Sequence, residues 1–444
     1  MPPNGITPPN PITIPYSPAF IAGQPLGLAA NIDNYAVDPN LKTPYSEMFT
    51  FSIQRELPGN FQLETAYVGR FAHRLIAQSD AMQTVEFKDP ASGQLLSKAF
   101  ANVASQVRSQ SGPTYTVTPQ PFFENQIGPG GTDYLANNVE PYVGRGDLAD
   151  AIEILNINNF FGVSPWAPGV GLAPQFGTNL YITNQAYSNY NGLLTTLHRK
   201  MSHGLQFDLN YTYSHSLDNI SATPNAAFGS NGAGGILCDA INLGVCYGNS
   251  DFDATHVITA DGLYQLPIGR GKMIGGGMSR WLNYAIGGWS ISGVDTWRTG
   301  LAFQTVSNAF PISFANNTPA IFNGDTAAIR NHIHVVNGQV QLFANPSAAI
   351  GAFSGPLGLQ AGSRNNLRGP HFSEVSLGLS KNFPVTEQVI VEFRADAYNV
   401  FNHANFGLPG TSSTADIDSP STFGVINTMA GQPRVLQLAL RIDF

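Results

Sequence analysis

The sequence predicts an all-β fold, a transmembrane antiparallel β-barrel, and three observations lead to it. Charged residues make up only 11% of the 444 residues, against about 25% in a typical soluble domain. Hydrophobic residues make up 43%, yet no stretch approaches the ~18 apolar residues of a membrane helix. The last residues alternate between two faces, as side chains do in a strand. The apolar face consists of Leu436, Leu438, Leu440, Ile442 and Phe444, and Gln437, Ala439, Arg441 and Asp443 lie opposite.

This alternation also fits a soluble antiparallel sheet with one face on a core. A barrel explains it together with the low charge, because lipid-facing and lumen-facing residues alternate along every strand. The 46 glycines and 31 prolines indicate many turns and long loops. The net charge of -8 and the lack of a basic run give no reason to expect nucleic acid as a partner.

The N-terminal residues carry no recognisable export signal, since the start of the chain has neither a basic nor an apolar segment. An outer-membrane protein needs such a signal, so we expect the chain to be a fragment that lacks an N-terminal part. Residues 1–44, rich in Pro, Asn and Gly, are expected to be a loop or a truncated upstream segment. Residues 45–444 are expected to be the barrel.

Four hairpins and the terminal strand account for about nine strands. The predicted pairs are 48–54 with 61–68, 190–199 with 205–214, 256–266 with 288–293, and 375–380 with 389–397. In the third pair, Asp295 shares a face with Trp289 and Ile291. A β-bulge explains this placement, and so does a position above the bilayer.

Short and long connections alternate along the chain. The short ones lie near residues 58, 202, 270 and 385, and the long ones are predicted at 73–177, 217–250, 300–369 and 404–432. Outer-membrane barrels have short periplasmic turns and long extracellular loops. Phe444 is therefore expected on the periplasmic side. Because nine strands is an odd number, the chain is expected to enter in the middle of a barrel and to supply its C-terminal portion.

Segments spread over residues 45–444 match a known family in order and spacing. They are Gln54-Arg55-Glu56-Leu57-Pro58, Tyr67-Val68-Gly69, Phe122-Phe123-Glu124-Asn125, Tyr190-Asn191-Gly192-Leu193, the segment from Tyr211 to Asn219, Leu266-Pro267-Ile268-Gly269, Gly287-Gly288-Trp289, the segment from Arg364 to Pro370, Lys381-Asn382-Phe383, Phe393-Arg394-Ala395-Asp396, and the segment from Asn399 to His403. With them the chain resembles the C-terminal barrel of TonB-dependent outer-membrane receptors, most closely the Oar-like group.

The resemblance implies a barrel of about 22 strands closed by an N-terminal plug domain, in the bacterial cell outer membrane. It implies uptake of a scarce nutrient with energy passed on by TonB. The plug is absent from this chain, so the TonB complex is expected to act only through that missing part. The alternating strand from Leu436 to Phe444 looks like the signal that the barrel-assembly machinery reads. The other expected partners are outer-membrane lipid and an unknown small ligand.

Several residues are candidates for a role, each beside a plainer explanation. Cys238 and Cys246 are expected to form a disulfide in an oxidising compartment, or they are free thiols. Glu392, Arg394 and Asp396 are expected to face the lumen as a ladder of charges rather than to act in acid–base catalysis. The loop aromatics Phe122, Phe123, Tyr134 and Trp166 could contact a ligand, although loop packing explains them equally well. His332 and His334 could bind zinc, but solvated loop histidines are commoner.

The function expected from these observations is that of an outer-membrane TonB-dependent receptor and transporter barrel. One alternative is a passive porin or structural barrel without an energised gate, and another is a secreted all-β binding or adhesion protein. No catalytic motif supports an enzyme, because the glycine-rich segment near 269–277 lacks the Walker spacing. No cofactor is expected.

Overall fold

The computed structural model of the chain describes residues 33–80, 83–160, 178–221, 235–245, 247–313, 318–386, 388–409 and 415–444. Among these residues the largest sheet has 11 strands, nine of which form one path in which each strand pairs with the next. In chain order they are β2 (Tyr45–Leu57), β3 (Phe61–Asp80), β4 (Thr178–Ser202), β5 (Leu205–Asp218), β7 (His256–Gln265), β8 (Trp289–Arg298), β15 (Phe372–Pro384), β16 (Ile390–Tyr398) and β18 (Val435–Asp443). We call these nine strands the wall. The prediction of an all-β fold with about nine strands is confirmed.

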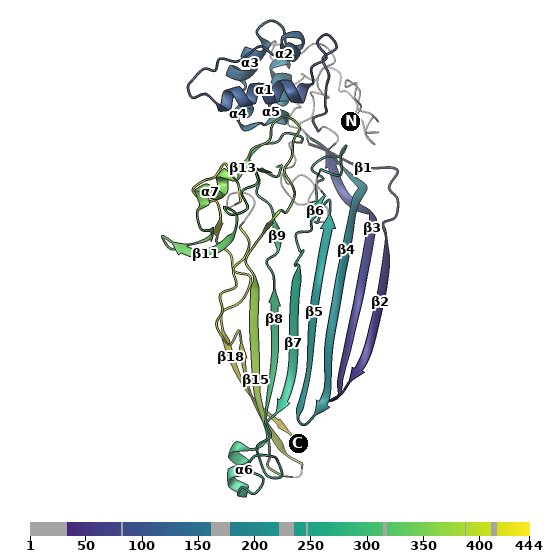
Figure 1. The fold of residues 1–444 in the computed structure, drawn as a ribbon, viewed down its shortest axis with the longest axis vertical. Coiled ribbons are helices and arrows are strands. Elements are labelled where there is room, and N and C mark those ends of the chain that lie inside the picture. Colours follow the sequence, from purple (N-terminus) through teal and green to yellow (C-terminus); the bar gives the residue numbers. More distant parts are fainter. Residues whose placement is uncertain are drawn as a thin grey trace.

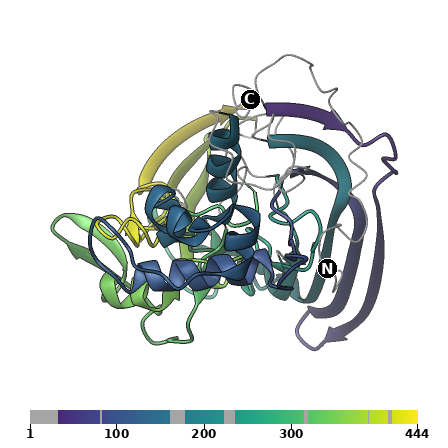
Figure 2. The ribbon, with the colours of Figure 1, turned by 90° about the horizontal axis from the view of Figure 1, so that it is seen from above.

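The wall is antiparallel and curved, and its strands follow the order of the sequence (Figures 1 and 2). Two short strands lie beside it, one within the predicted N-terminal loop. β1 (Asp33–Val37) pairs in parallel with the start of β4, and β6 (Gly248–Asn249) pairs with β5. In the described part of the chain, β2 and β18 each pair on one side only. The wall is therefore an open section of a barrel.

A tight turn joins the two strands of each of the first two hairpins of the wall, β2 with β3 and β4 with β5. His203 and Gly204 connect β4 to β5 with φ values of 51° and 81°, and Gly59 and Asn60 before β3 have φ values of 86° and 65°. Two consecutive residues with positive φ match the right-handed twist of the strands on either side. We call the end of the wall with these turns and Phe444 the turn end, and the opposite end the loop end (Figure 1).

The register of the wall divides its side chains into two faces. Residues paired across antiparallel strands point to the same side. One row runs from Leu438 through Ala395, Leu379, Ile291, Tyr264 and Leu205. The parity of this row defines the apolar face, which also carries Phe51, Ile53, Tyr67, Leu193, Leu197, Leu209 and Phe393. Leu438 is 74% exposed, so the protein itself does not cover this face of β18.

The pairing of β8 with β7 and with β15 runs without a register shift. No bulge therefore re-aims Asp295, and it stays on the apolar face opposite Ala260 and Val375. Of the two sequence explanations, the position above the bilayer remains.

The predicted short turn between β7 and β8 is wrong in length. Residues 266–288 form this connection, which contains helix α6 (Arg280–Ile286) at the turn end (Figure 1). Ser279 caps the helix, because its hydroxyl accepts a hydrogen bond from the Leu282 amide. The glycines of 269–277 signalled a turn correctly, but the seven-residue helix is too short to give a clear periodic pattern.

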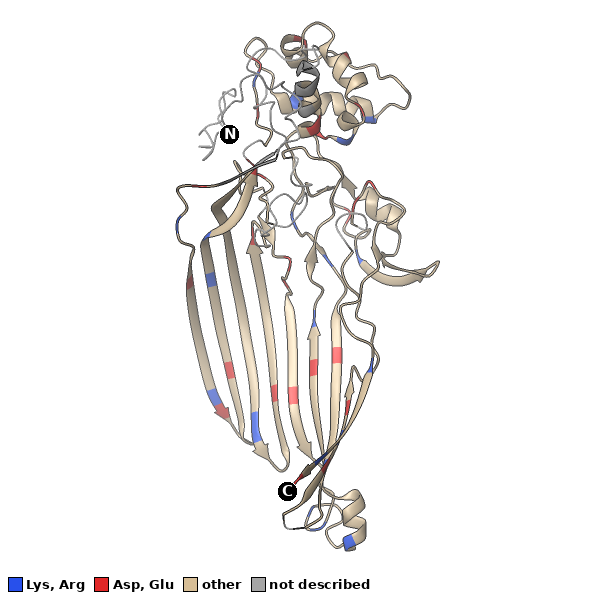
Figure 3. Ribbon diagram, turned by 180° about the vertical axis from the view of Figure 1, so that it is seen from behind, with Lys and Arg blue, Asp and Glu red and all other residues tan. Residues whose placement is uncertain are grey.

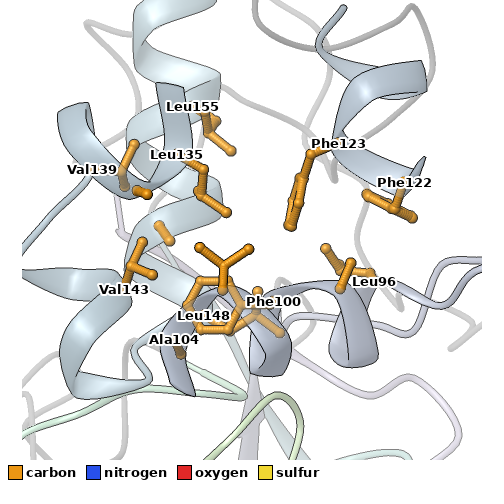
Figure 4. Packing of buried hydrophobic residues seen from close by; sticks show 14 of the residues in the cluster. Leu96, Phe100, Ala104, Phe122, Phe123, Leu135, Val139, Val143, Leu148 and Leu155 are labelled. Atoms are coloured by element: carbon orange, nitrogen blue, oxygen red, sulfur yellow. The ribbon is translucent and has the colours of Figure 1, made fainter. Parts of the chain in front are cut away.

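At the loop end, residues predicted to be an irregular loop form a helical subdomain. β3 continues to Asp80, and five helices follow it: α1 (Leu96–Arg108), α2 (Pro121–Gln126), α3 (Gly131–Asn138), α4 (Tyr142–Arg145) and α5 (Leu148–Phe160). Side chains from all five helices point toward one core (Figure 4). The signal for α1 was present in the sequence, since Leu96, Ala99, Phe100, Val103, Ala104 and Val107 repeat at helical spacing and are buried.

A second core at the loop end joins two connections that are far apart in sequence. The connection from β8 to β15 contains β9 (Ala302–Phe303), β10 (Ile321–Phe322), β11 (Asn331–Val336), β12 (Gln339–Phe343), α7 (Pro346–Gly351), β13 (Phe353–Ser354) and β14 (Leu367–Arg368). The connection from β16 to β18 contains β17 (Val425–Ile426), which pairs with β12. Phe343 and Phe423 stack between the two connections, with ring centroids 5.5 Å apart. These long loops are therefore folded rather than irregular.

Within the described residues, no helix has the length and apolar character needed to cross a membrane.

If the apolar face contacts lipid, a charge placed on it should oppose folding into a membrane. We predict that Leu438→Arg destabilises the folded barrel by about 2–4 kcal/mol, the cost of a basic residue near the bilayer midplane. Urea titrations of the full-length protein in phospholipid vesicles measure the effect. Ala439→Arg on the other face is the matched control and should change stability much less. Equal effects at the two positions would contradict the assignment of faces.

Candidate functional site

The face of the wall opposite the apolar face is lined by polar side chains, and we call it the polar face. One row across it pairs Gln54, Glu64, Thr196, Asn210, Thr259, Thr296 and Glu374 in register. The Thr196 hydroxyl donates a hydrogen bond to Asn210 Oδ1 at 2.9 Å. In the next row His198 Nδ1 contacts the carboxylate of Asp208, and Asp208 lies opposite Asp261. A polar surface of this kind suits the water-filled interior of a barrel.

The three charges predicted to face the lumen lie on the polar face. Arg394 Nε donates to both carboxylate oxygens of Asp396, at 2.9 and 2.8 Å. Glu392 lies opposite Arg441, whose Nε donates to Asp443 at 2.8 Å. The register and these pairs make the residues a ladder of charges. Both ion pairs are partly exposed, so each contributes only about 0–1 kcal/mol to stability.

Acidic residues outnumber basic ones on the polar face, as the register of the charged positions coloured in Figure 3 shows. The register places nine acidic residues there, Glu56, Glu64, Asp208, Asp218, Asp261, Glu374, Glu392, Asp396 and Asp443, and it places the basic residues Arg70, Arg298, Arg394 and Arg441 on the same face. A surface lined mainly by one sign of charge attracts solutes of the opposite sign. The polar face thus favours cations over anions.

An arginine brace holds the loop end of the wall. Arg364 pairs with the carboxylate of Asp218 at the end of β5, and its Nη2 donates to Ser221 at 2.6 Å and to Asp251 at 2.8 Å. Asn365 donates to the Asn249 carbonyl at 2.7 Å. These contacts tie the connection from β8 to β15 onto the segment that precedes β7.

Arg368 forms the second half of this brace. Its guanidinium pairs with the buried carboxylate of Asp253 and donates to the Asp253 carbonyl at 2.7 Å. The segment from Arg364 to Pro370 is one of those that carry the family resemblance, and the structure assigns its two arginines a bracing role. Such pairs are costly to break, because removing one partner leaves a buried charge uncompensated.

Two carboxylates of the helical subdomain are well satisfied by hydrogen bonds. Burial alone would raise the pKa of Asp89, but hydrogen bonds from Ser92, Asn125 and Gln126 lower it to about 2. Burial of Glu124 is likewise outweighed, because Thr132 and Gly130 donate to it and hold its pKa below the usual value. Both groups remain ionised and connect α2 to its neighbouring turns.

Asp147 and Asp150 are two further carboxylates of the helical subdomain, and burial raises the pKa of both. Asp147 is fully buried beside α5, and its Oδ2 has no hydrogen-bond partner among the described residues. Burial raises the pKa of Asp147 to about 8, and the neighbouring carboxylate of Asp150 acts in the same direction. Burial also raises the pKa of Asp150. Burial of the pair therefore favours the protonated form of Asp147.

The structure places the predicted ligand-contacting aromatics differently from the expectation. Phe122 and Phe123 are each 1% exposed in the core of the helical subdomain, so loop packing explains them and neither is retained as a contact. Tyr134 is half-buried against the same core. Trp166 lies outside the described residues. Phe122 and Phe123 lie on α2 and pack against apolar residues of α1 in this core. Neither helix was predicted from the sequence, and so the burial of the two rings was not expected.

The remaining candidates are in the loop regions. Cys238 is buried, and Cys246 lies outside the described residues, so their pairing stays a prediction. His332 and His334 belong to β11, with ring centroids 5.6 Å apart. In the described part of the chain, no three His, Cys, Asp or Glu side chains gather as a metal site would require.

The arginine brace makes a stability prediction. Arg364→Ala leaves Asp218, whose side chain is 3% exposed, without its cation, and such a loss costs about 3–5 kcal/mol. We expect hydrogen exchange to speed up in segments 247–253 and 364–368 while the wall stays protected. Arg330→Ala, an exposed arginine in the same connection, is the control and should leave exchange unchanged.

The buried acid pair makes a pH prediction. The folded-state pKa of Asp147 lies above its unfolded value of 3.8, so folding binds a proton and stability falls as pH rises between about 4 and 8. Protection factors of the α4 and α5 amides, which correct for the rise of intrinsic exchange with pH, should be lower at the upper end of this range than at the lower end. Asp147→Asn, which cannot ionise, should remove the dependence. Unchanged pH dependence in this variant would contradict the assignment.

One family model and several solved structures match this chain. A family model described as an outer membrane beta barrel domain matches residues 2–437. No curated protein matches the chain by sequence. Among solved structures, the outer membrane transporter YddB from Escherichia coli is 10% identical with a TM-score of 0.38. The match covers 94% of this chain and 34% of the YddB chain.

Two further solved structures are similar at the same level. The pyoverdine outer membrane receptor FpvA from Pseudomonas aeruginosa, bound to pyoverdine, is 9% identical with a TM-score of 0.35, covering 94% of this chain and 32% of its own. The FrpB iron transporter from Neisseria meningitidis is 10% identical with a TM-score of 0.34, and the match covers 92% of this chain and 32% of the FrpB chain. This chain thus spans about a third of the length of these proteins. Since the family model matches nearly the whole chain, the chain belongs to the outer membrane beta-barrel domain family and is a protein of the bacterial outer membrane.

Proposed function

We propose that this chain is the C-terminal wall and extracellular part of a TonB-dependent transporter of the Oar-like group, which takes up a scarce nutrient. The observation that carries the proposal is the folded region at the loop end, formed by the helical subdomain and by the connections from β8 to β15 and from β16 to β18. We call this region the extracellular assembly. Its connections form two buried cores and an arginine brace. A pore for free diffusion needs no such assembly over its mouth, whereas a receptor needs a rigid scaffold that positions binding residues.

In this proposal the extracellular assembly captures the ligand and the polar face lines its route. The acidic majority on the polar face favours a neutral or cationic ligand over an anionic one. Opening of the route and coupling to energy belong to a plug outside this chain. The barrel-assembly machinery would read the strand from Leu436 to Phe444, whose Leu436, Leu438, Leu440 and Ile442 lie on the apolar face.

The main alternative is a passive porin, and conductance separates the two. We expect the full-length protein in a planar bilayer to show no steady conductance, because a plug closes the lumen. Uptake by cells should stop when the TonB complex is deleted. Steady conductance together with TonB-independent uptake would establish the porin instead.

The charge of the polar face gives a matched test of the route. We predict that Glu64→Gln, Asp208→Asn and Asp261→Asn together lower the preference for cations over anions, measured as the reversal potential of the plug-deleted barrel. The control carries Glu86→Gln, Asp133→Asn and Asp325→Asn, which remove the same charge from the extracellular assembly and should leave selectivity unchanged. If both triple variants shift the reversal potential equally, the polar face is not the route.

A further inference from the structure

The periplasmic connection that contains α6 is a surface feature that the barrel fold does not explain. None of the residues of α6 is buried. Trp281 is 85% exposed and Met273 is 83% exposed. The other large exposed apolar side chains of residues 266–288 are Ile274, Leu282, Tyr284 and Ile286. An apolar surface this exposed indicates an interaction site.

The helix is fixed to the wall by a buried lysine. Lys381 of β15 is 4% exposed, and its ammonium donates to the Ala285 carbonyl at 3.1 Å and to the Tyr284 carbonyl. It also lies over the rings of Phe383 and Trp289, 4.8 and 5.4 Å from their centroids. The lysine therefore satisfies carbonyls that the helix end leaves unpaired and positions α6 at the end of the wall.

The register shows on which side of the wall α6 lies. Lys381 pairs with Trp289 and with Phe393, and it shares a side of β15 with Leu377 and Leu379. All of these residues belong to the apolar face. Because Lys381 holds the helix, α6 lies on the lipid side of the wall at its periplasmic end rather than beneath the lumen.

The charge of this region is entirely basic. Residues 266–288 contain Arg270, Lys272 and Arg280 and no acidic residue, in a chain with a net charge of -8. Arg55 and Arg199 lie on the apolar face near the same end, and Figure 3 shows basic positions both on α6 and at the lower ends of the strands. Aromatic and basic residues together are typical of a membrane interface.

We propose that residues 266–288 form an anchor that inserts into the periplasmic leaflet of the outer membrane and binds anionic phospholipid. Trp281, Leu282 and Ile286 enter the boundary between headgroups and acyl chains. Arg270, Lys272 and Arg280 bind headgroup phosphates. Lipid is favoured over a protein partner because the anchor continues the lipid-facing surface of the wall and complements anionic headgroups. The inference requires the outer-membrane location and is independent of transport.

The test follows Trp281 in the full-length protein folded into phosphatidylcholine vesicles with and without phosphatidylglycerol. The emission of Trp281→Phe subtracted from that of the unchanged protein isolates this one indole. We expect quenching by lipids brominated near the headgroup, weaker quenching by lipids brominated near the chain end, and little quenching by acrylamide. Acrylamide quenching without lipid quenching, or protection from both quenchers, overturns the proposal, since Trp281 is then in water or under protein.

The basic residues are tested with matched charge variants. Arg270→Gln, Lys272→Gln and Arg280→Gln together should abolish the response of Trp281 quenching to phosphatidylglycerol, because each basic residue near the surface contributes about a fivefold preference for anionic lipid. Lys42→Gln, Lys98→Gln and Arg330→Gln remove the same charge at the opposite end and should keep the response. An equal loss in both variants overturns the proposal. If the first variant fails to fold, the Trp281→Phe comparison still decides.

Discussion

The structure depends on one constraint, that backbone amides and carbonyls inside a bilayer must find partners within the protein. In the wall, strand pairing meets this need, and the pairing runs from β4 to β18 without a shift over most of its length. Once the register is continuous, the face of every side chain is determined by its partner. The alternation of apolar and polar residues in the terminal strand is therefore repeated, in register, in the other strands of the wall. The apolar and polar faces, and the position of α6, all follow from it.

The same constraint explains where the apolar face carries charge. Arg199 lies over the ring of Phe61, 5.1 Å from its centroid, and Lys381 lies over two rings beneath a helix end. Both are near the turn end of their strands. Long basic side chains can reach the headgroup region from such positions while their stems stay against apolar surface. The short side chain of Asp295 has no comparable reach.

The strands of the wall could be predicted from the sequence, but the folded connections at its loop end could not. Alternation is a local signal with a period of two, so strands such as β5, β16 and β18 could be predicted from their own residues. The helical repeat of Leu96, Phe100 and Val103 was also local, but it was overlooked among the prolines and glycines around it. The pairing of β12 with β17 and of Arg364 with Asp218 joins residues distant in sequence. No local pattern encodes such contacts, and so the brace could not be predicted. The aromatic pair Phe122 and Phe123 was misjudged for the same reason, since burial depends on neighbours.

The second core at the loop end has a consequence for how this protein can change. Residues from the connection between β8 and β15 and from the connection between β16 and β18 fill one interior. The Val306 amide donates a hydrogen bond to the Ala415 carbonyl, and the Val306 carbonyl accepts one from the Ile417 amide. Arg108 reaches across from the helical subdomain to the Pro356 carbonyl at 2.8 Å. The loops therefore cannot be inherited or exchanged one at a time. If the chain is the proposed receptor, a new binding specificity must arise through coordinated substitutions in several connections, or be acquired by replacing the loop-end connections as a unit.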